Sequence, residues 1–106
     1  DYIQIGNEIN GGMLWPEGAI ANRENFVTLL KQGVQAVRDQ KADTKIMIHY
    51  AGTEADWFYS ILKSQSVSYD IIALSYYPRW HTKSLSEVKA ALSRLSVAND
   101  KDIVLA

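Results

Sequence analysis

The sequence predicts an α/β fold in which parallel β-strands are joined by α-helices. Short apolar segments alternate with amphipathic ones along all 106 residues, in the order β-α-β-α-β-α-β. Hydrophobic residues make up 47% of the chain, which is enough to build a packed core. The strands also become polar toward their carboxyl ends. Strands that alternate with helices are normally parallel and joined by right-handed crossovers, so we expect a single parallel sheet covered by helices.

The first predicted strand covers residues 3–6 and leads into a glycine-rich loop, NEINGGMLWPEG. The following helix is predicted from residue 22 to about residue 40. It is indicated by apolar residues that recur at helical spacing: Phe26, Leu29, Leu30, Val34 and Val37.

The second predicted strand covers residues 45–49, and a helix with Thr53 as its N-cap and Asp56 three residues later is expected to follow. The segment YDIIALSYY, residues 69–77, is rich in strand-forming residues and predicts the third strand. Ser84 and Glu87 have the spacing of a capping box and predict the start of a third helix. Residues 102–106 predict a fourth strand.

The polarity of the strands separates two architectures that share this order of elements. Because side chains alternate between the faces of a strand, Glu8, His49, Ser75 and Tyr77 are expected to meet at the carboxyl rim of the sheet. A doubly wound sheet has more uniformly aliphatic strands, and its GxGxxG phosphate turn is missing here. A complete (β/α)8 barrel needs about 250 residues. The chain is therefore predicted to form a parallel half-barrel, one partial domain over residues 1–106 with two unpaired sheet edges.

Composition argues against several classes of function. The net charge is −1 and Lys and Arg do not cluster, which disfavours nucleic acid and anionic membranes as partners. No apolar run approaches the ~18 residues of a membrane span. The absence of cysteine excludes disulfides and cysteine-based metal sites, and His49 has no second histidine at ligand spacing, so we expect no metal site. The amino terminus, DYI, resembles neither a signal peptide nor a start, and we expect the chain to lie inside something longer.

The residues at the rim suit carbohydrate hydrolysis. Glycosidases place paired carboxyl groups about the scissile bond, and one of them must hold a proton near neutral pH. Apolar or aromatic neighbours can raise the pKa of such a group, as we expect for Glu8. The amide of Asn7 is expected to donate to a sugar hydroxyl, and the indoles of Trp15 and Trp80 to stack on sugar rings.

The same residues carry a resemblance to known enzymes. GNE at the end of a strand resembles the fourth-strand motif of the large clan of (β/α)8-barrel glycosidases. The collinear segments QIGNEINGGMLWPEG, TKIMIHYAG, DIIALSYYPRWH and DIVLA resemble the endo-β-1,4-galactanases of glycoside hydrolase family 53 along essentially the whole chain. The resemblance implies strands four to seven of a TIM barrel, a β-1,4-galactan substrate, no cofactor, and an extracellular or periplasmic location. It leaves the oligomeric state open.

The resemblance also implies roles for individual residues. It makes Glu8 the general acid/base of a retaining, endo-acting enzyme, with the nucleophile a glutamate expected just after Ala106. The chain alone is therefore expected to be inactive. The substrate-binding residues that it implies are Asn7 at the sugar 2-hydroxyl, Tyr77 bonded to the nucleophile, His49 and Trp80 in the cleft, and Trp15 at a subsite.

Three alternatives stay open. A related barrel glycosidase, such as a mannanase or an endoglucanase, has the same rim chemistry, although the loop NGGMLWPEG favours a galactanase. A non-catalytic carbohydrate-binding half-barrel needs no nucleophile, and a third possibility is an inactive structural fragment. A serine nucleophile is disfavoured because the sequence shows no base for Ser75, and Asp56, Asp70 and Asp102 are interpreted as cap or strand-edge acids.

Overall fold

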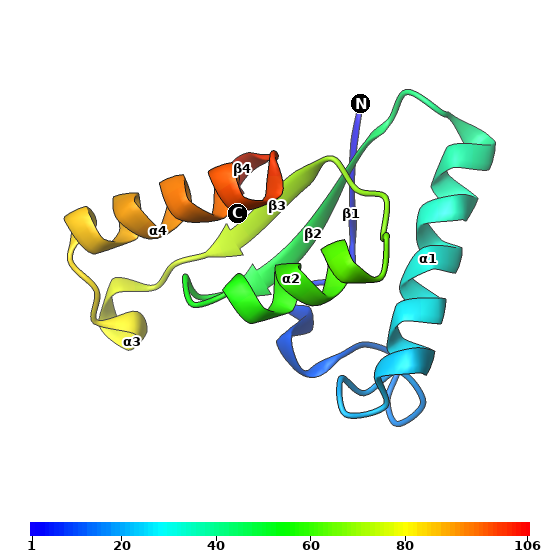
Figure 1. Ribbon diagram of the computed structural model, residues 1–106, viewed down its shortest axis with the longest axis horizontal. Coiled ribbons are helices and arrows are strands. Elements are labelled where there is room, and N and C mark those ends of the chain that lie inside the picture. The colour runs from blue at the N-terminus through cyan, green and yellow to red at the C-terminus, as the bar shows by residue number, and fades with distance from the viewer.

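A four-stranded parallel sheet forms the centre of the computed structural model, which describes residues 1–106. Every pair of neighbouring strands is parallel, and helices connect them (Figure 1). The predicted alternation is therefore confirmed. The strands are β1 (Tyr2–Ile5), β2 (Lys45–Ala51), β3 (Ile71–Ser75) and β4 (Asp102–Leu105), and the long helices are α1 (Arg23–Gln40), α2 (Asp56–Ser64) and α4 (Leu85–Asn99).

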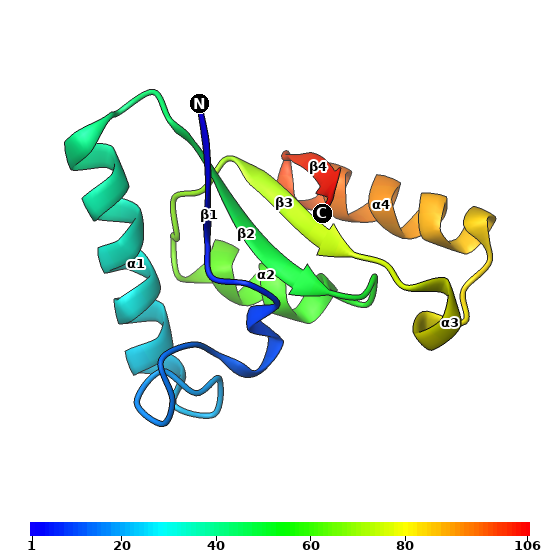
Figure 2. The ribbon, with the colours of Figure 1, turned by 180° about the vertical axis from the view of Figure 1, so that it is seen from behind.

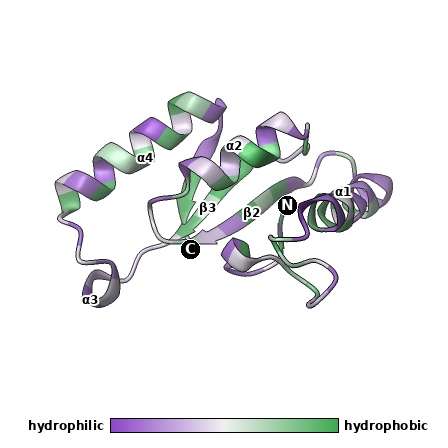
Figure 3. Ribbon diagram, turned by 60° about the horizontal axis from the view of Figure 1, so that its bottom comes forward, coloured by the Kyte–Doolittle hydropathy of each residue, from purple (hydrophilic) through white to green (hydrophobic).

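The order of the strands in space decides between the two architectures. They lie in the order β1-β2-β3-β4, which is also their order along the chain. A doubly wound sheet reverses its strand order at a switch point, and this sheet does not. Helices α2 and α4 lie on the same side of the sheet (Figure 3), as they do around the outside of a barrel.

The core lies between the sheet and its helices. Ile46 and Ile48 of β2 and Ile72 and Leu74 of β3 are completely buried on the face that meets the helices. Burial of one aliphatic side chain contributes about 1.5–3 kcal/mol to folding. Because alternate residues point to opposite faces, this packing directs His49 to the other face of β2. The helical residues in the same core include Phe26, Val27, Leu30, Phe58, Tyr59, Leu62 and Leu95.

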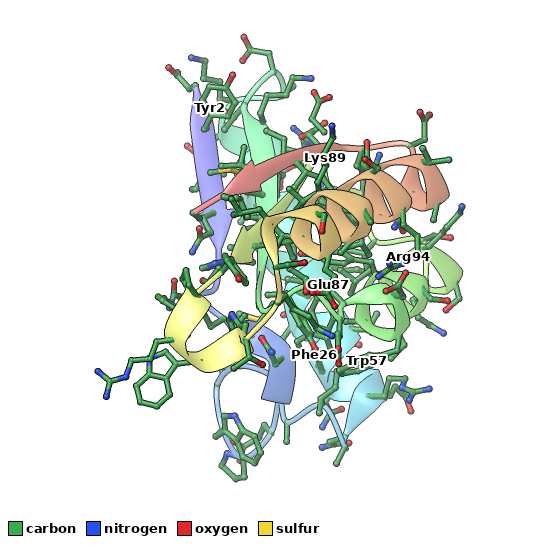
Figure 4. The ribbon with its side chains drawn as sticks, turned by 90° about the vertical axis from the view of Figure 1, so that its left-hand side faces the viewer. Tyr2, Phe26, Trp57, Glu87, Lys89 and Arg94 are labelled. Atoms are coloured by element: carbon green, nitrogen blue, oxygen red, sulfur yellow. The ribbon has the colours of Figure 1, made fainter.

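The starts of two helices test the predicted caps. The capping box is confirmed, since Glu87 N donates to Ser84 Oγ over 3.3 Å and Ser84 N donates to Glu87 Oε2 over 2.8 Å. The predicted Thr53 cap is wrong. Helix α2 begins at Asp56 with Ala55 as its N-cap residue, while Thr53 is buried. Arg94 of α4 (Figure 4) instead binds both carboxylate oxygens of Asp56, each over 2.8 Å.

Two short helices that the sequence analysis did not predict follow strands at the carboxyl end of the sheet. A 3-10 turn, η1 (Ile9–Gly11), follows β1, and α3 (Pro78–His81) follows β3. Figure 2 shows the loop after β1 and α3 at the end of the sheet to which β2 and β3 point. Strand β3 is shorter than predicted, because Tyr76 and Tyr77 belong to the connection before Pro78. A proline at the first helical position favours a helix start there.

Candidate active site

Glu8 lies in the loop that follows β1, in a backbone conformation that few residues adopt. Its φ of 49° and ψ of 50° place it in the left-handed region. Non-glycine residues rarely occur there, and those that do are concentrated at functional sites. The following turn is fixed by Asn10, whose side chain donates to Ala51 O and accepts from Ala51 N, both over 2.8 Å. The loop that carries Glu8 is thereby attached to the end of β2.

The Glu8 carboxylate is held by two hydroxyl groups from the segment at the end of β3. Its Oε1 accepts from Ser75 Oγ over 2.7 Å and from Tyr77 OH over 3.0 Å. No protein group donates to Oε2, which leaves this oxygen available to a ligand. The bonds from Ser75 and Tyr77 lower the pKa of Glu8. The raised pKa expected for Glu8 concerns the complete enzyme; in this chain, hydroxyl donors rather than an apolar pocket surround the carboxylate.

His49 lies behind Glu8 and Asn7 rather than at the surface. Only 4% of the residue is exposed. Its Nε2 lies 2.7 Å from Ser75 Oγ, and its Nδ1 lies 3.0 Å from Asn7 Oδ1. Burial lowers the pKa of His49, and the negative charge of Glu8 opposes that effect. His49 thus contacts the side chains next to the candidate acid, although the resemblance places it in the cleft.

Ser75 has a basic partner that the sequence alone did not reveal. The expectation that no base accompanies it is wrong, since His49 Nε2 is within hydrogen-bonding distance. The serine is only 1% exposed, and its hydroxyl donates to Glu8. A buried hydroxyl in that position has no access to a substrate. A serine nucleophile remains disfavoured, but because of burial rather than for lack of a base.

The aromatic residues of the rim divide into two groups. Tyr77 contacts Glu8 and is 48% exposed. Trp15 and Trp80 are 68% and 73% exposed, and neither makes a hydrogen bond to Glu8. Trp80 borders a hollow of about 280 Å³, and the Arg79 guanidinium lies over its ring at 5.5 Å. Hydrogen bonds thus connect Asn7, Glu8, His49 and Tyr77, while both tryptophans are exposed to solvent.

Three supporting residues were not anticipated. Asn10 positions the loop, Gln4 donates to Asn7 Oδ1 over 3.3 Å, and His81 Nδ1 accepts from Tyr77 N over 2.9 Å. His81 follows Tyr77 by four residues, which is one helical turn, and that spacing could have indicated the contact. Gln4 shares a strand face with Gly6 and Glu8 and could have been included for that reason.

The largest hollow lies elsewhere. It measures about 420 Å³ and is lined at the amino end of the sheet by residues that include Tyr2, Lys45, Asp70 and Asp102. Parallel α/β sheets bind ligands at their carboxyl ends. We therefore place the candidate site at Glu8 on the basis of its contacts rather than of cavity size.

No group of three or more His, Asp or Glu side chains is arranged to hold a metal ion. None of the helices combines the length and apolar composition that a membrane span requires.

Parallel βα units with an Asn-Glu pair and aromatic side chains at the carboxyl rim define the class of barrel glycoside hydrolases. Comparison with known proteins identifies the family within that class. The family model described as Glycosyl hydrolase family 53 matches residues 1–106. The chain belongs to this family.

Individual relatives agree with that assignment. The arabinogalactan endo-β-1,4-galactanase A of Aspergillus niger is 33% identical over 99% of this chain, which spans 33% of that protein. The arabinogalactan endo-β-1,4-galactanase of Cellvibrio japonicus is 35% identical, also over 99% of this chain. The chain thus spans about a third of the length of these relatives.

A solved structure confirms the fold. The catalytic domain of Ignisphaera aggregans from the same family superposes on 98% of this chain with a TM-score of 0.92 and 43% identity. The superposition covers 29% of the Ignisphaera chain. The predicted partial (β/α)8 barrel is therefore confirmed.

Proposed function

We propose that these residues supply the fourth to seventh strands of an endo-acting, retaining galactanase in which Glu8 is the general acid/base. One observation carries this proposal: Glu8 is fixed at the carboxyl rim by hydroxyl groups that occupy only Oε1. The remaining oxygen, Oε2, faces no protein donor and is the atom that would exchange a proton with the substrate. The membership of the family supports a glycosidic substrate.

The proposed reaction is a double displacement. A glutamate just after Ala106, at the end of β4, would attack the anomeric carbon while Glu8 Oε2 donates a proton to the glycosidic oxygen. In the second step, Glu8 would take a proton from the water that attacks the glycosyl-enzyme bond. Retaining enzymes hold the two carboxyl groups about 5 Å apart. A second carboxylate at that distance raises the pKa of Glu8 and favours its protonated, acidic form.

The substrate proposal rests on the relatives and on the rim. Several relatives are named as arabinogalactan endo-β-1,4-galactanases. We assign Asn7 to the 2-hydroxyl of the sugar next to the scissile bond, and Tyr77 to contacts with the reacting carboxylates. Trp15 and Trp80 are assigned to outer subsites, since both indoles are exposed and can stack on sugar rings. A polymeric pectic galactan does not cross membranes, which favours an extracellular or periplasmic location.

Hydrolysis of polysaccharides by the complete catalytic domain carrying residues 1–106 tests this function. We expect a rapid fall in the viscosity of galactan, as endo cleavage requires, with the β-anomer as the first product in NMR spectra. Faster cleavage of mannan or of a soluble cellulose would contradict the galactanase assignment and favour a mannanase or an endoglucanase. An α-anomer as first product would contradict the retaining mechanism.

The isolated chain provides a matched control. Without a second carboxylate it is expected to cleave nothing, because double displacement needs both groups. Calorimetry with galactan oligosaccharides tests the binding-module alternative, which requires measurable heat at millimolar sugar. Cleavage of galactan by the isolated chain would contradict the assignment of the nucleophile.

A further inference from the structure

The side chains behind Glu8 form an unbroken series of hydrogen bonds into the protein. Ser75 Oγ lies 2.7 Å from Glu8 Oε1 and 2.7 Å from His49 Nε2. His49 Nδ1 lies 3.0 Å from Asn7 Oδ1. Both His49 and Ser75 are almost completely buried. The general acid/base proposed above is thus connected through two buried groups to the neighbouring Asn7.

The orientation of Asn7 determines which nitrogen of His49 carries a hydrogen. Gln4 Nε2 donates to Gly6 O over 2.9 Å, which fixes the direction of its amide, and the same nitrogen donates to Asn7 Oδ1. Asn7 therefore presents its oxygen, and His49 Nδ1 must donate to it. Glu8 N also lies near Nδ1, but at 3.4 Å. A hydrogen bond from Glu8 N would require Nδ1 to accept, whereas the bond to Asn7 Oδ1 requires it to donate. We assign the hydrogen to Nδ1 because the contact to Asn7 is the shorter one.

With a hydrogen on Nδ1, the remaining bonds have two consistent arrangements. In one, a positively charged His49 donates from Nε2 to Ser75 Oγ, and Ser75 donates to an ionised Glu8. In the other, Glu8 Oε1–H donates to Ser75 Oγ, and Ser75 donates to the lone pair of a neutral His49 Nε2. Both contain the same number of protons. They interconvert when the Nε2 proton moves to Oγ as the Oγ proton moves to Oε1, so one N–H and one O–H bond break while two O–H bonds form.

We propose that His49 and Glu8 share one proton through the hydroxyl of Ser75. The two buried residues, His49 and Ser75, thus form a proton relay behind the catalytic acid. The proposal rests on the role proposed above for Glu8. In the first step of the reaction, Glu8 gives its proton to the leaving group. Because that proton is the one the pair shares, the step leaves Glu8 ionised and His49 neutral. In the second step Glu8 takes a proton from the attacking water, and the pair again holds one proton. Rotation of the Glu8 carboxyl about its Cγ–Cδ bond exchanges the substrate side and the Ser75 side, so the relay can then place this proton on His49.

The surroundings of the pair favour an exchange between these two groups. Ser75 and Tyr77 from the end of β3 bond to Glu8, and His81 of α3 is the other titratable group whose charge acts on it. Gln4 and Asn7 on the side of β1 are neutral. Lys and Arg side chains do not contact Glu8 or His49. Burial acts against the charged His49 of the first arrangement, and the hydroxyl donors on Oε1 act against the protonated Glu8 of the second. No fixed positive charge decides between them.

Nitrogen-15 NMR of histidine in the complete catalytic domain tests the relay. The His49 signals are assigned from their loss in His49→Gln. In Glu8→Gln, the amide imitates the protonated acid and donates to Ser75. The relay then predicts a neutral His49 with its hydrogen on Nδ1 and an accepting Nε2. A hydrogen on Nε2 in this variant would overturn the proposal, and this measurement does not depend on any change at Ser75.

A double-mutant cycle separates the relay from simple attraction between charges. Glu8→Gln is expected to shift the pH at which His49 titrates, and Ser75→Ala is expected to remove most of that shift. A shift of equal size with and without Ser75 would show that the coupling acts through space, and would overturn the relay. His81→Gln is the matched control and should leave the coupling unchanged.

The two proposals can fail separately. Coupling through Ser75 in a domain that cleaves no galactan would contradict the proposed function and leave the relay in place. Galactan cleavage without coupling through Ser75 would support the proposed function and overturn the relay.

Discussion

Two carboxylates at opposite ends of the sheet are held in different ways. Asp70, just before β3, accepts from Arg38 Nη2 over 2.6 Å and from Ile46 N over 2.8 Å. Glu8, just after β1, accepts from the hydroxyl groups of Ser75 and Tyr77. Each acid thus joins different βα units, and Glu8 joins the first to the third, but Asp70 has a cationic partner and Glu8 has only neutral ones.

The difference decides what each acid can do. Burial raises the pKa of Asp70, but the Ile46 N–H and the Arg38 guanidinium outweigh it, so the net pKa is lowered. The pKa of Glu8 is lowered by hydroxyl donors. A guanidinium can only donate, whereas a hydroxyl can donate or accept. Asp70 therefore stays charged as part of the fold, while the surroundings of Glu8 can accommodate both of its protonation states.

The largest expected effect is that of Glu8→Gln on catalysis. In the complete domain, kcat/KM on galactan should fall by about 10²–10⁴-fold, because general acid–base catalysis contributes that much. The free energy of unfolding should change little, since the amide keeps the shape of the side chain and no charged partner is lost. Steady-state kinetics and urea unfolding of the same preparation measure both quantities. A large loss of stability with little loss of rate would make Glu8 a structural acid.

Asp70→Asn should show the reverse pattern. The free energy of unfolding should fall by about 1.5–3 kcal/mol, as expected when a charged hydrogen-bond acceptor is removed. The rate per folded molecule should stay unchanged, because Asp70 lies at the amino end of the sheet. Urea unfolding and active-site titration check these two results. A fall in kcat comparable to that of Glu8→Gln would invalidate the contrast between the two ends.

The pH dependence of stability sharpens the same contrast. The pKa of Asp70 is lower in the folded than in the unfolded chain, so its contribution is present above the unfolded pKa of about 3.9. It is lost as the pH falls through the lower, folded pKa. Between neutral and strongly acidic pH, the free energy of unfolding should therefore fall less in Asp70→Asn than in the unchanged protein. Identical acid sensitivity in both proteins would show that Asp70 is not the stabilising charge.

Tyr77→Phe should have the smallest effect. It removes one of the two donors to Glu8, and loss of that bond raises the pKa of Glu8. Because the acid form is needed in the first step, the alkaline limb of kcat/KM should move to higher pH. A pH–rate profile measures this shift. Movement of the limb to lower pH would mean that the hydroxyl stabilises the protonated carboxyl.

The sequence allowed the faces of the strands to be predicted, but not the contacts between them. Ile46 and Ile48 alternate with Met47 and His49, and this pattern predicted the buried face of the strand correctly. The contact between His49 and Ser75 depends on the register in which His49 pairs with Ala73, and no local pattern contains that register. The lowered pKa of Glu8 has the same origin, because both of its donors come from the end of another strand.

The predicted caps show the limit of local spacing. Ser84 and Glu87 form a capping box within one turn, so the residues themselves determine it. Thr53 has a comparable spacing to Asp56, but its side chain is buried and Asp56 is bound by Arg94 of another helix. The Asp56 carboxylate is thus held by a tertiary contact that the local spacing does not contain.

The central claim, that Glu8 protonates the leaving group, is tested most directly by the dependence of the Glu8→Gln rates on the leaving group. Galactan needs a protonated leaving oxygen, whereas a nitrophenyl galacto-oligosaccharide needs little assistance. Pre-steady-state rates of the first step should therefore fall steeply on galactan and only slightly on the nitrophenyl substrate. Equal losses on both substrates would contradict the account.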